Sequence, residues 1–322
     1  MTASPGRRLE QAMLNPTTLI ATALGSHLAE SYREIYGERE PRYASTLEAT
    51  ARLVMEHLAG SDALYHDRDH TFMVTLVGQS ILRGRILVEE VTPEDWLHFT
   101  VALLCHDIGY LRGICPGDAE QSFVINEDGE TVRAPRGASD AFLSPYHIER
   151  GKIFVRHRCR SIEHLDAERI ARAIELTRFP VPEDGDHDET ETEAGLLRAA
   201  DLIGQLGDPF YPRKLNALFH EFVETGMAKR LGFASPADIA ERYPRFFWSK
   251  VEPCVGPALA HLERTVEGKQ WIANLYAHVF VEEHVRARPG PQRAPGQEGA
   301  GPGKASPPLD DSGPSAVATP GR

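Results

Sequence analysis

The chain has 322 residues, of which 47 are acidic and 35 basic, and its formal net charge is -12. This charge gives the protein no bulk attraction for polyanions, so we expect it to bind neither nucleic acid nor an anionic membrane surface. Hydrophobic residues make up 41% of the chain and charged residues 25%, which is typical of a globular protein and excludes disorder throughout.

Cysteine usage and apolar runs bear on where the protein works. None of the four cysteines belongs to a C-x-x-C pair, which argues against a disulfide framework and against a thiolate zinc site. No run approaches the roughly 18 to 20 apolar residues that span a bilayer, and the N-terminus lacks the apolar stretch of a signal peptide. We therefore expect a soluble, cytoplasmic protein.

Helical spacing of apolar residues dominates the chain. Residues 1–60 are expected to form a helical segment that packs on the core, because Leu47 and Leu58 fall on one apolar face. Thr92-Pro93 is a helix start signal, and the helix that it opens is expected to run to His106. Further helices are expected near residues 147–158, 166–179, 191–206, 210–230 and 236–283, the last interrupted around Pro244 and Pro253. The pattern predicts an all-α bundle of roughly nine or ten helices.

Two polar segments interrupt this pattern. Residues 113–146 form an insertion rich in glycine and proline, whose length is typical of a lid or a disordered loop. Inside it, Ser122–Asn126 and Thr131–Val132 give the signal of a β-hairpin. Residues 183–193 carry seven acids in eleven residues, but a glutamate stands where a calcium loop needs glycine, so we expect a solvated acidic loop.

The remaining segments complete the expected organisation. Residues 61–207 form the expected central core, and residues 208–285 add C-terminal helices whose aromatic residues pack the bundle or a homo-oligomer surface. Residues 286–322 hold 8 prolines and 7 glycines and no aromatic side chain. Such a segment buries too little apolar area to order itself, so we expect a disordered tail, with a partner-binding arm as the alternative.

Three places in the core carry residues suited to chemistry. His66 and His70 are four residues apart, so a helix would place both imidazoles on one face. His106 and Asp107 end an apolar helix, where adjacent side chains can reach one ion and a buried charge needs compensation. Asp201 lies within another apolar helix and also needs a partner: a metal, an arginine such as Arg198, or the backbone N–H groups of a helix that it caps.

In this order, His70, the His106-Asp107 pair and Asp201 resemble the H, HD, D pattern of the HD-domain metal-dependent phosphohydrolase superfamily. The resemblance covers residues 64–207. It implies an HD-domain helical bundle in which these four side chains hold a divalent metal (manganese, iron, zinc or magnesium). It also implies hydrolysis of a phosphate ester, of a nucleotide or another small molecule, with Asp107 as a catalytic residue.

Two shorter matches refine the resemblance. Tyr65-His66-x-x-x-His70 is similar to the Tyr-His-Asn-x-x-His segment of cyclic-nucleotide phosphodiesterases, which implies that His66 is the general acid. The string from His147 to Gly151 resembles the His-x-x-x-Gly helix start of dinuclear members, which implies that His147 is a ligand of a second metal.

Departures from the better known branches limit what the resemblance implies. Asp67 stands where phosphodiesterases have asparagine, and Tyr110 where they have another histidine, so the cyclic-nucleotide assignment does not transfer. The His-His pair and the Gly-Tyr-Pro signature of the HD-GYP enzymes are absent, as is the charged pair that guanosine-tetraphosphate hydrolases place after HD. The chain thus resembles a less specialised branch.

The expected mechanism is metal-assisted hydrolysis. A metal lowers the pKa of its bound water, which attacks the phosphorus in line, and His66 protonates the leaving alkoxide. Candidate phosphate anchors are Arg112, Lys152, Arg178, Arg213 and Lys214. The alternative for each is a solvated or structural base.

Two other function classes fit the same residues. One is a non-catalytic HD-like module that binds a ligand or partner and keeps a structural metal, although such a module has no need of His66. The other is a di-iron centre with oxidative chemistry, which needs further ligands such as His147 or His164.

Overall fold

Helices make up nearly all of the regular structure in the computed structural model, which describes residues 15–284. The expected all-α class is confirmed. Over this range the α-helices are α1 (Pro16–Tyr36), α2 (Pro41–Leu58), α3 (Arg68–Arg85), α4 (Pro93–Cys105), α5 (His147–Cys159), α6 (Ala167–Glu175), α7 (Glu193–Leu206), α8 (Tyr211–Glu224), α9 (Met227–Leu231), α10 (Pro236–Phe246), α11 (Glu252–Leu262) and α12 (Val266–His284). The tail expected at residues 286–322 lies outside the described residues.

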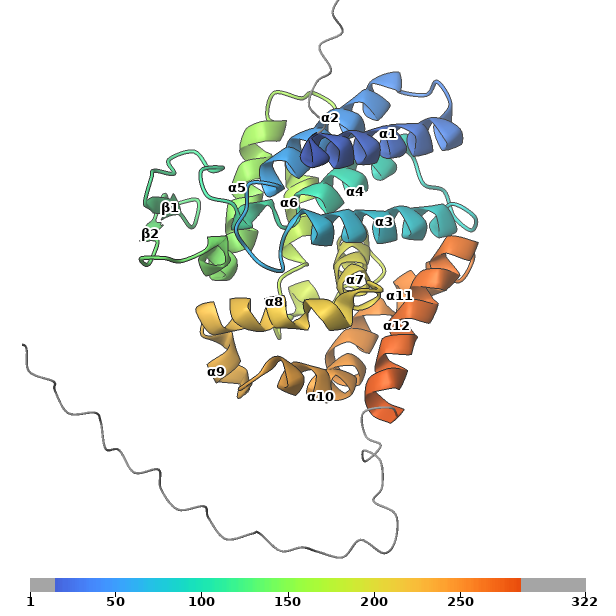
Figure 1. Cartoon of the computed structure of the whole chain (residues 1–322). Helices are drawn as coiled ribbons and strands as arrows, with labels where there is room; N and C mark the ends of the chain where they lie inside the picture. Colours follow the sequence, from blue (N-terminus) through green and yellow to red (C-terminus); the bar gives the residue numbers. More distant parts are fainter. Residues whose placement is uncertain (1–14, 285–322) are drawn as a thin grey trace, which may run out of the picture.

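The helices form layers around a central group (Figure 1). Helices α3, α4 and α7 pack against one another, and α1 and α2 form a pair that covers this group through α2 and α4. Helices α5 and α6 lie on one side, and α11 and α12 contact α3 and α7 on the other. One apolar core runs through all of these elements and buries Trp96, Phe99 and Phe247.

Local sequence explains where the two central helices begin. Thr92 caps α4 in a capping box with Asp95, and Pro93 occupies the first turn. Asp67 caps α3, because its carboxylate accepts from the backbone N–H groups of Asp69 and His70. Each cap satisfies N–H groups that a helix start leaves without an intrahelical partner. The start signal at Thr92 is therefore confirmed.

The insertion at residues 113–146 is structured. Strands β1 (Ser122–Val124) and β2 (Thr131–Arg133) pair antiparallel, with Phe123 opposite Val132, so the hairpin signal is confirmed. The 3-10 helix η2 (Asp140–Tyr146) follows and leads directly into α5. The hairpin lies at the left edge of the molecule in Figure 1.

The C-terminal helices differ from the expected pattern in two ways. The helix expected at 210–230 divides into α8 and α9 at Gly226, whose φ of 73° is a conformation that favours glycine. Pro244 lies inside α10 without ending it, and a π-helical turn, Phe247–Val251, joins α10 to α11. Pro253 lies in the first turn of α11, so the run of helical residues that begins at Pro236 is interrupted only between α11 and α12.

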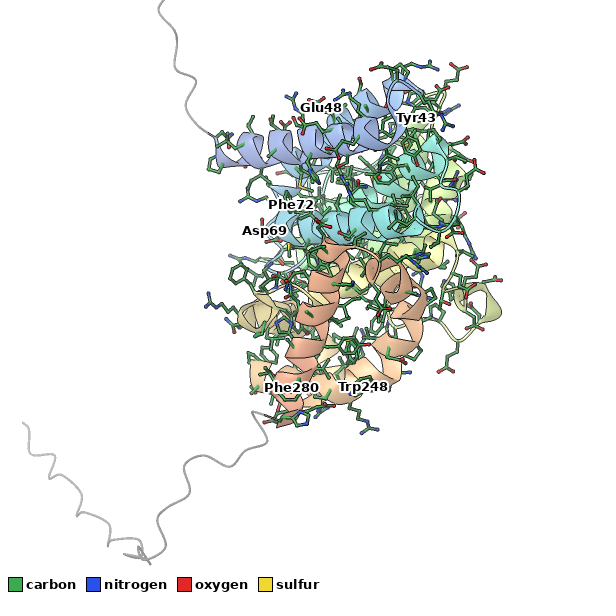
Figure 2. All side chains as sticks on the ribbon, turned by 90° about the vertical axis from the view of Figure 1, so that its right-hand side faces the viewer. Tyr43, Glu48, Asp69, Phe72, Trp248 and Phe280 are labelled. Carbon is green, nitrogen blue, oxygen red and sulfur yellow. The ribbon has the colours of Figure 1, made fainter. Side chains whose placement is uncertain are left out.

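This end of the molecule presents aromatic side chains at its surface. Trp248 and Phe280 are about half exposed and lie near one another at the lower end of the view in Figure 2. The indole N–H of Trp248 donates to Glu283 Oε1 at 2.8 Å, which links the π-helical turn to α12. The expected aromatic packing of the bundle is carried mainly by the buried Phe247 and Tyr243.

Two further expectations concern cysteines and membranes. All four cysteines are free and buried, in agreement with the absence of a disulfide framework. Among the helices of residues 15–284, none combines the length and the apolar character that crossing a bilayer requires.

Candidate metal centre

Four predicted ligands converge where α3, α4 and α7 meet. His70 Nε2 lies 3.1 Å from Asp201 Oδ1 and 3.3 Å from Asp107 Oδ2. His106 Nε2 lies 3.3 Å from the same Asp107 oxygen, 3.7 Å from Asp201 Oδ1 and 3.4 Å from His70 Nε2. One ligand atom each of His70, His106 and Asp201 falls within a group of atoms no more than 4.8 Å apart. The predicted convergence of the three segments is thus present.

The ends of helices and one close helix contact bring these side chains together. His70 lies in the first turn of α3, while His106 is the residue that ends α4 and Asp107 follows it. Helices α3 and α7 approach closely at Gly204, where a Cβ atom would lie 2.8 Å from the Cα of Val74. Gly204 comes one turn after Asp201, and Val74 one turn after His70. The lack of a side chain at 204 therefore lets the two ligands face each other.

No arginine or lysine of the described residues forms an ion pair with Asp107 or Asp201. Arg198, the predicted alternative partner of Asp201, instead donates to the backbone oxygens of His187 and Glu189. The arginine alternative is therefore wrong, and the imidazoles are the groups that face Asp201.

Burial and charge shift the pKa values of the cluster strongly. Burial alone would lower the pKa of His70, but the carboxylates of Asp107 and Asp201 raise it to about 10. Burial alone would raise the pKa of Asp107, but the His106 and His70 imidazoles hold it well below its usual range. In the absence of another cation, protons on the imidazoles compensate the buried carboxylates.

The donor set fits a divalent metal. Asp107 Oδ2 is buried 3.3 Å from the Nε2 atoms of His70 and His106, but neither contact has the geometry of a regular hydrogen bond. A buried carboxylate oxygen without a hydrogen bond is costly unless a cation compensates it. His106 Nδ1 lies 2.8 Å from the backbone oxygen of Leu103, an arrangement in which Nδ1–H donates and Nε2 is free to act as a ligand. Imidazole and carboxylate together suit zinc, iron, manganese or magnesium in differing degrees.

His66 is close to this cluster but not on the helix predicted for it. Helix α3 begins at Arg68, after its cap Asp67, so His66 lies in the preceding bend and does not share a helix face with His70. The prediction failed because the Asp67 side chain bonds the first N–H groups of α3 and fixes its start there. The two imidazole rings are nevertheless 5.5 Å apart, centre to centre.

Sequence reasoning missed Glu221, the partner of His66. Glu221 lies on α8, and its Oε2 is 2.6 Å from His66 Nδ1. Its Oε1 accepts from the backbone N–H groups of Tyr65 and His66, at 2.6 Å and 3.1 Å. Burial opposes the charged imidazole, but the Glu221 carboxylate outweighs it and raises the pKa of His66. The sequence offered only a weak indication of this pair, because Glu221 is an acid in an apolar stretch 155 residues from His66.

His147 lies at the edge of the cluster. Its Nε2 is 3.8 Å from Asp107 Oδ1, and its Nδ1 is 2.5 Å from the backbone oxygen of Ser144. Burial lowers the pKa of His147, which favours the neutral form that a metal needs. The ring of Tyr110 stacks between His147 at 4.5 Å and His66 at 4.6 Å. His164, the other extra ligand considered, stacks on Tyr43 instead.

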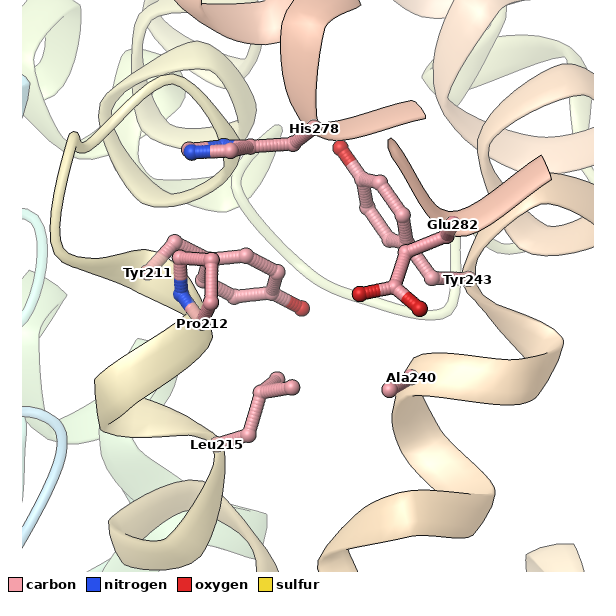
Figure 3. A pocket seen from close by; sticks show the side chains of 7 residues that line it. All are labelled: Tyr211, Pro212, Leu215, Ala240, Tyr243, His278 and Glu282. Atoms are coloured by element: carbon pink, nitrogen blue, oxygen red, sulfur yellow. The ribbon is translucent and has the colours of Figure 1, made fainter. Parts of the chain in front are cut away.

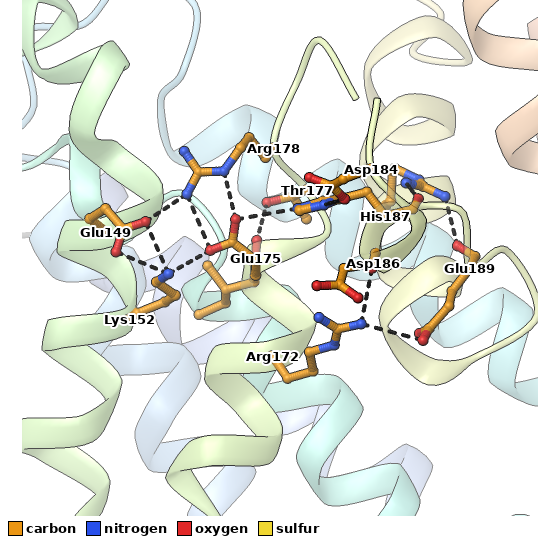
Figure 4. A network of polar contacts seen from close by, with 12 residues as sticks. Glu149, Lys152, Arg172, Glu175, Thr177, Arg178, Asp184, Asp186, His187 and Glu189 are labelled. Carbon is orange, nitrogen blue, oxygen red and sulfur yellow. Dashed lines mark hydrogen bonds and ion pairs between the residues drawn. The ribbon is translucent and has the colours of Figure 1, made fainter. Parts of the chain in front are cut away.

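Two of the predicted phosphate anchors are held in a charge network (Figure 4). Lys152 lies 2.9 Å from Glu149 and 2.5 Å from Glu175. Arg178 lies 2.7 Å from Glu149 and 2.6 Å from Glu175. The network continues through His187, which lies 3.4 Å from Glu175, into the acidic loop. These bases are already paired with acids of their own.

The other predicted anchors have partners as well. Arg112 lies 2.9 Å from Asp140, and Lys214 lies 2.7 Å from Asp208. The guanidinium of Arg213 lies over the ring of Phe210, 5.6 Å from its centre. The structural reading accounts for each of these contacts.

Two cavities differ in what they can hold. One, between α8, α10 and α12, has a volume of about 10 Å³, enough for a single water (Figure 3). The other has a volume of about 330 Å³, within the range of small-molecule sites. It is lined by His57, Gly60, Asp62, Leu111, Arg112, Ile114 and Asp140. Its walls come from the segments that lead to His66 and away from Asp107.

Comparison with known proteins identifies a family. A family model described as Npun_R2479-like matches residues 14–285, which is most of the chain. That description names no activity and no ligand. Neither the curated proteins nor the solved structures gave a match.

Proposed function

The chain belongs to the Npun_R2479-like family, and we propose that it is a metal-dependent phosphohydrolase of the HD type. One observation carries the proposal: the imidazoles of His70 and His106 lie between two carboxylates, 3.3 Å from the buried Asp107 Oδ2 and 3.1 Å and 3.7 Å from Asp201 Oδ1. The order of the four ligands in the sequence, H, HD and D, supports the same assignment.

The chain's own residues divide the work of binding. His70, His106 and Asp201 supply the clustered ligand atoms, and Asp107 lies 3.3 Å from both imidazoles, so these four side chains would hold the metal. His147, with its Nε2 3.8 Å from Asp107 Oδ1, is a candidate further ligand. A divalent cation in such a site supplies a water of lowered pKa and neutralises charge on a phosphoryl group. Asp201 is the most exposed of the four, with 21% of its side chain accessible, so the substrate approaches from its side.

His66 supports hydrolysis over mere metal storage. It lies outside the ligand group, 19% of its side chain is exposed, and Glu221 holds its Nδ1. Glu221 favours the protonated imidazole, and Nε2 is then the atom that donates a proton to the departing alkoxide. Stacking on Tyr110 fixes the plane of the ring. His66 is thus arranged as the general acid and Glu221 as its positioning residue.

A phosphate ester of a small molecule is the substrate class that fits this arrangement. The bases tested as anchors are all paired with acids or rings, so charge recognition of a polyanion finds little support here. A cavity of about 330 Å³, lined by residues that include Asp62, Leu111 and Arg112, is within the size range of small-molecule sites, although no candidate metal ligand lines it.

The test is hydrolysis by the purified chain loaded with manganese, iron, zinc or magnesium. The substrates are p-nitrophenyl phosphate, bis-p-nitrophenyl phosphate and a panel of nucleotides. We expect turnover that Asp107→Ala abolishes and that the control Glu175→Gln, from the charge network, leaves unchanged. Activity that persists in Asp107→Ala would contradict the mechanism. Stoichiometric metal without turnover would favour a non-catalytic module, and iron with oxygen consumption would favour the di-iron alternative.

A further inference from the structure

The insertion at residues 113–146 is joined to the candidate metal centre by one fully buried arginine, Arg150 of α5. Its guanidinium contacts both carboxylate oxygens of Asp118, at 3.1 Å and 2.9 Å, and donates to the Val124 backbone oxygen at 2.5 Å. Both partners belong to the insertion. These bonds alone would make Arg150 a fastener of the hairpin.

The same guanidinium also reaches the turn that follows Asp107. Its Nε donates to the Gly109 backbone oxygen at 2.9 Å, and its Nη2 donates to the Leu111 backbone oxygen at 2.6 Å. These two carbonyls flank Tyr110 in the 3-10 helix η1 (Ile108–Tyr110), which begins directly after Asp107. One side chain therefore binds the insertion and the ligand-bearing turn together.

The backbone contact between this turn and α5 makes the geometry specific. A Cβ atom at Gly109 would lie 1.8 Å from the backbone oxygen of His147, so the turn packs directly on the first residue of α5. Arg150 comes one turn after His147 on that helix. Because Arg150 pulls the Gly109 carbonyl toward α5, it holds Asp107 and His147 at their observed separation of 3.8 Å between Oδ1 and Nε2.

Only an arginine can make this set of contacts. A planar guanidinium presents five N–H donors in a fixed fork, whereas a lysine presents three donors from one atom. Lysine can keep the ion pair with Asp118 but cannot also reach the carbonyls of Gly109, Leu111 and Val124, which lie in different directions. Replacement of Arg150 by lysine therefore keeps the positive charge but removes the bonds that depend on the shape of the guanidinium.

We propose that Arg150 is a positioning residue of the metal centre, which sets the separation of Asp107 and His147 and makes the folding of the insertion a condition for a competent site. The proposal rests on the proposed function. Arg156 offers a matched control, because it lies on the same helix and also bonds the insertion, through Glu127, but contacts no carbonyl of the turn at residues 107–111.

The experiment compares Arg150→Lys with Arg156→Lys in the full chain. Binding of Mn²⁺ alone is titrated, and the side-chain ¹⁵N resonances of the histidines are recorded without metal. For Arg150→Lys we expect the Mn²⁺ affinity to fall by about 10- to 100-fold, as for other residues that orient metal ligands. The resonances of His106 and His147 should move, while that of His98 stays. Arg156→Lys should match the wild type in both measurements.

Each outcome decides between the readings. A folded Arg150→Lys protein with wild-type histidine resonances overturns the proposal, as does equal movement in Arg156→Lys. If Arg150→Lys does not fold, Asp118→Asn is measured by the same resonances, since it keeps the arginine and removes the charge of a carboxylate that also accepts from the backbone N–H groups of Cys115 and Val124. Movement of the His147 resonance in Asp118→Asn supports the proposal, and wild-type resonances overturn it. If the wild type binds no Mn²⁺, the proposed function fails, and the metal-free resonances still test the role of Arg150.

Discussion

Helix α5 separates two groups of charged side chains that solve the same electrostatic problem differently. On one side, Lys152 and Arg178 lie between Glu149 and Glu175, so each acid contacts two bases. On the other side, His147 borders a cluster in which two carboxylates face only imidazoles. The charge network is balanced within the protein, whereas the metal cluster depends on protons or on a cation from solution.

The difference lies in burial and in the type of partner. Burial alone would raise the pKa of Glu175, but Arg178 and Lys152 outweigh it and lower the pKa to about 2. Asp107 is more deeply buried, and its neighbours His70 and His106 are groups that lose their charge when they bind a metal. The charge network needs no added ion and is therefore suited to a structural role. The His/Asp cluster needs protons or a cation, which suits it to binding a metal.

The largest expected effect tests whether the chemistry belongs to the metal cluster. His66→Gln removes the proton donor without removing a ligand, so kcat should fall by about 10² to 10⁴ for an ester with a poorly acidic alcohol. Lys152→Met, in the charge network, should leave kcat unchanged. Steady-state kinetics measures both. Equal losses of kcat in the two variants would mean that His66 is no more important for catalysis than a residue of the charge network.

The second prediction concerns stabilisation by metal. At a concentration of 100 times its Kd, Mn²⁺ should stabilise the folded chain by about 2.7 kcal/mol, because the ion binds only the folded state. Asp201→Asn should remove most of this gain, since Asp201 supplies one of the clustered ligand atoms. Chemical unfolding with Mn²⁺ and with EDTA measures the difference. A gain that survives in Asp201→Asn would point to a site elsewhere.

The third prediction uses the pH dependence of the proposed general acid. An acid catalyst must be protonated, so activity falls as pH rises through the pKa of His66. Glu221 raises that pKa, and Glu221→Gln should therefore move this limb of the pH profile to lower pH. At neutral pH, kcat should fall by less than in His66→Gln, and metal affinity should stay the same. A profile that does not move would exclude Glu221 as the positioning residue.

The smallest effect belongs to the balanced network. The pKa of Glu175 is lowered, so its ion pairs add stability above the ordinary carboxyl pKa, and this stability is lost as pH falls from about 4.5 to about 2. Glu175→Gln should cost about 1 kcal/mol at neutral pH, less than the pKa shift alone implies, because Glu149 still pairs with both Lys152 and Arg178, and it should cost nothing below pH 2. Urea unfolding at several pH values tests this. A cost that grows as the pH falls would contradict it.

Several helix boundaries and the four candidate ligands were within reach of sequence reasoning, because short local patterns point to them. Thr92 and Asp95 cap α4 with their own side chains. The apolar run before His106 places the helix end where a histidine and a carboxylate can converge. The expectation that His66 and His70 share a helix face failed for a local reason. The Asp67 side chain caps α3, so the helix begins after His66.

The partners of these residues were out of reach. Arg198 looked like a partner for Asp201 because it lies on the same helix three positions away, yet its guanidinium bonds the acidic loop. Arg112 and Lys214 looked like phosphate anchors, because the sequence does not reveal that Asp140 and Asp208 lie against them. The sequence shows the charge of each side chain, but only the fold shows which group of opposite charge lies against it.

The sequence by itself determined the helical class, the hairpin inside the insertion and the identity of the candidate ligands, since periodicity, caps and motif order act over a few residues. Only the tertiary structure decided that Glu221 supports His66 and that Arg150 joins the insertion to the turn after Asp107. Both contacts cross between distant segments, and helix packing alone sets which segments meet. The close approach at Gly204 is the physical reason that two of the ligands lie within reach of one ion.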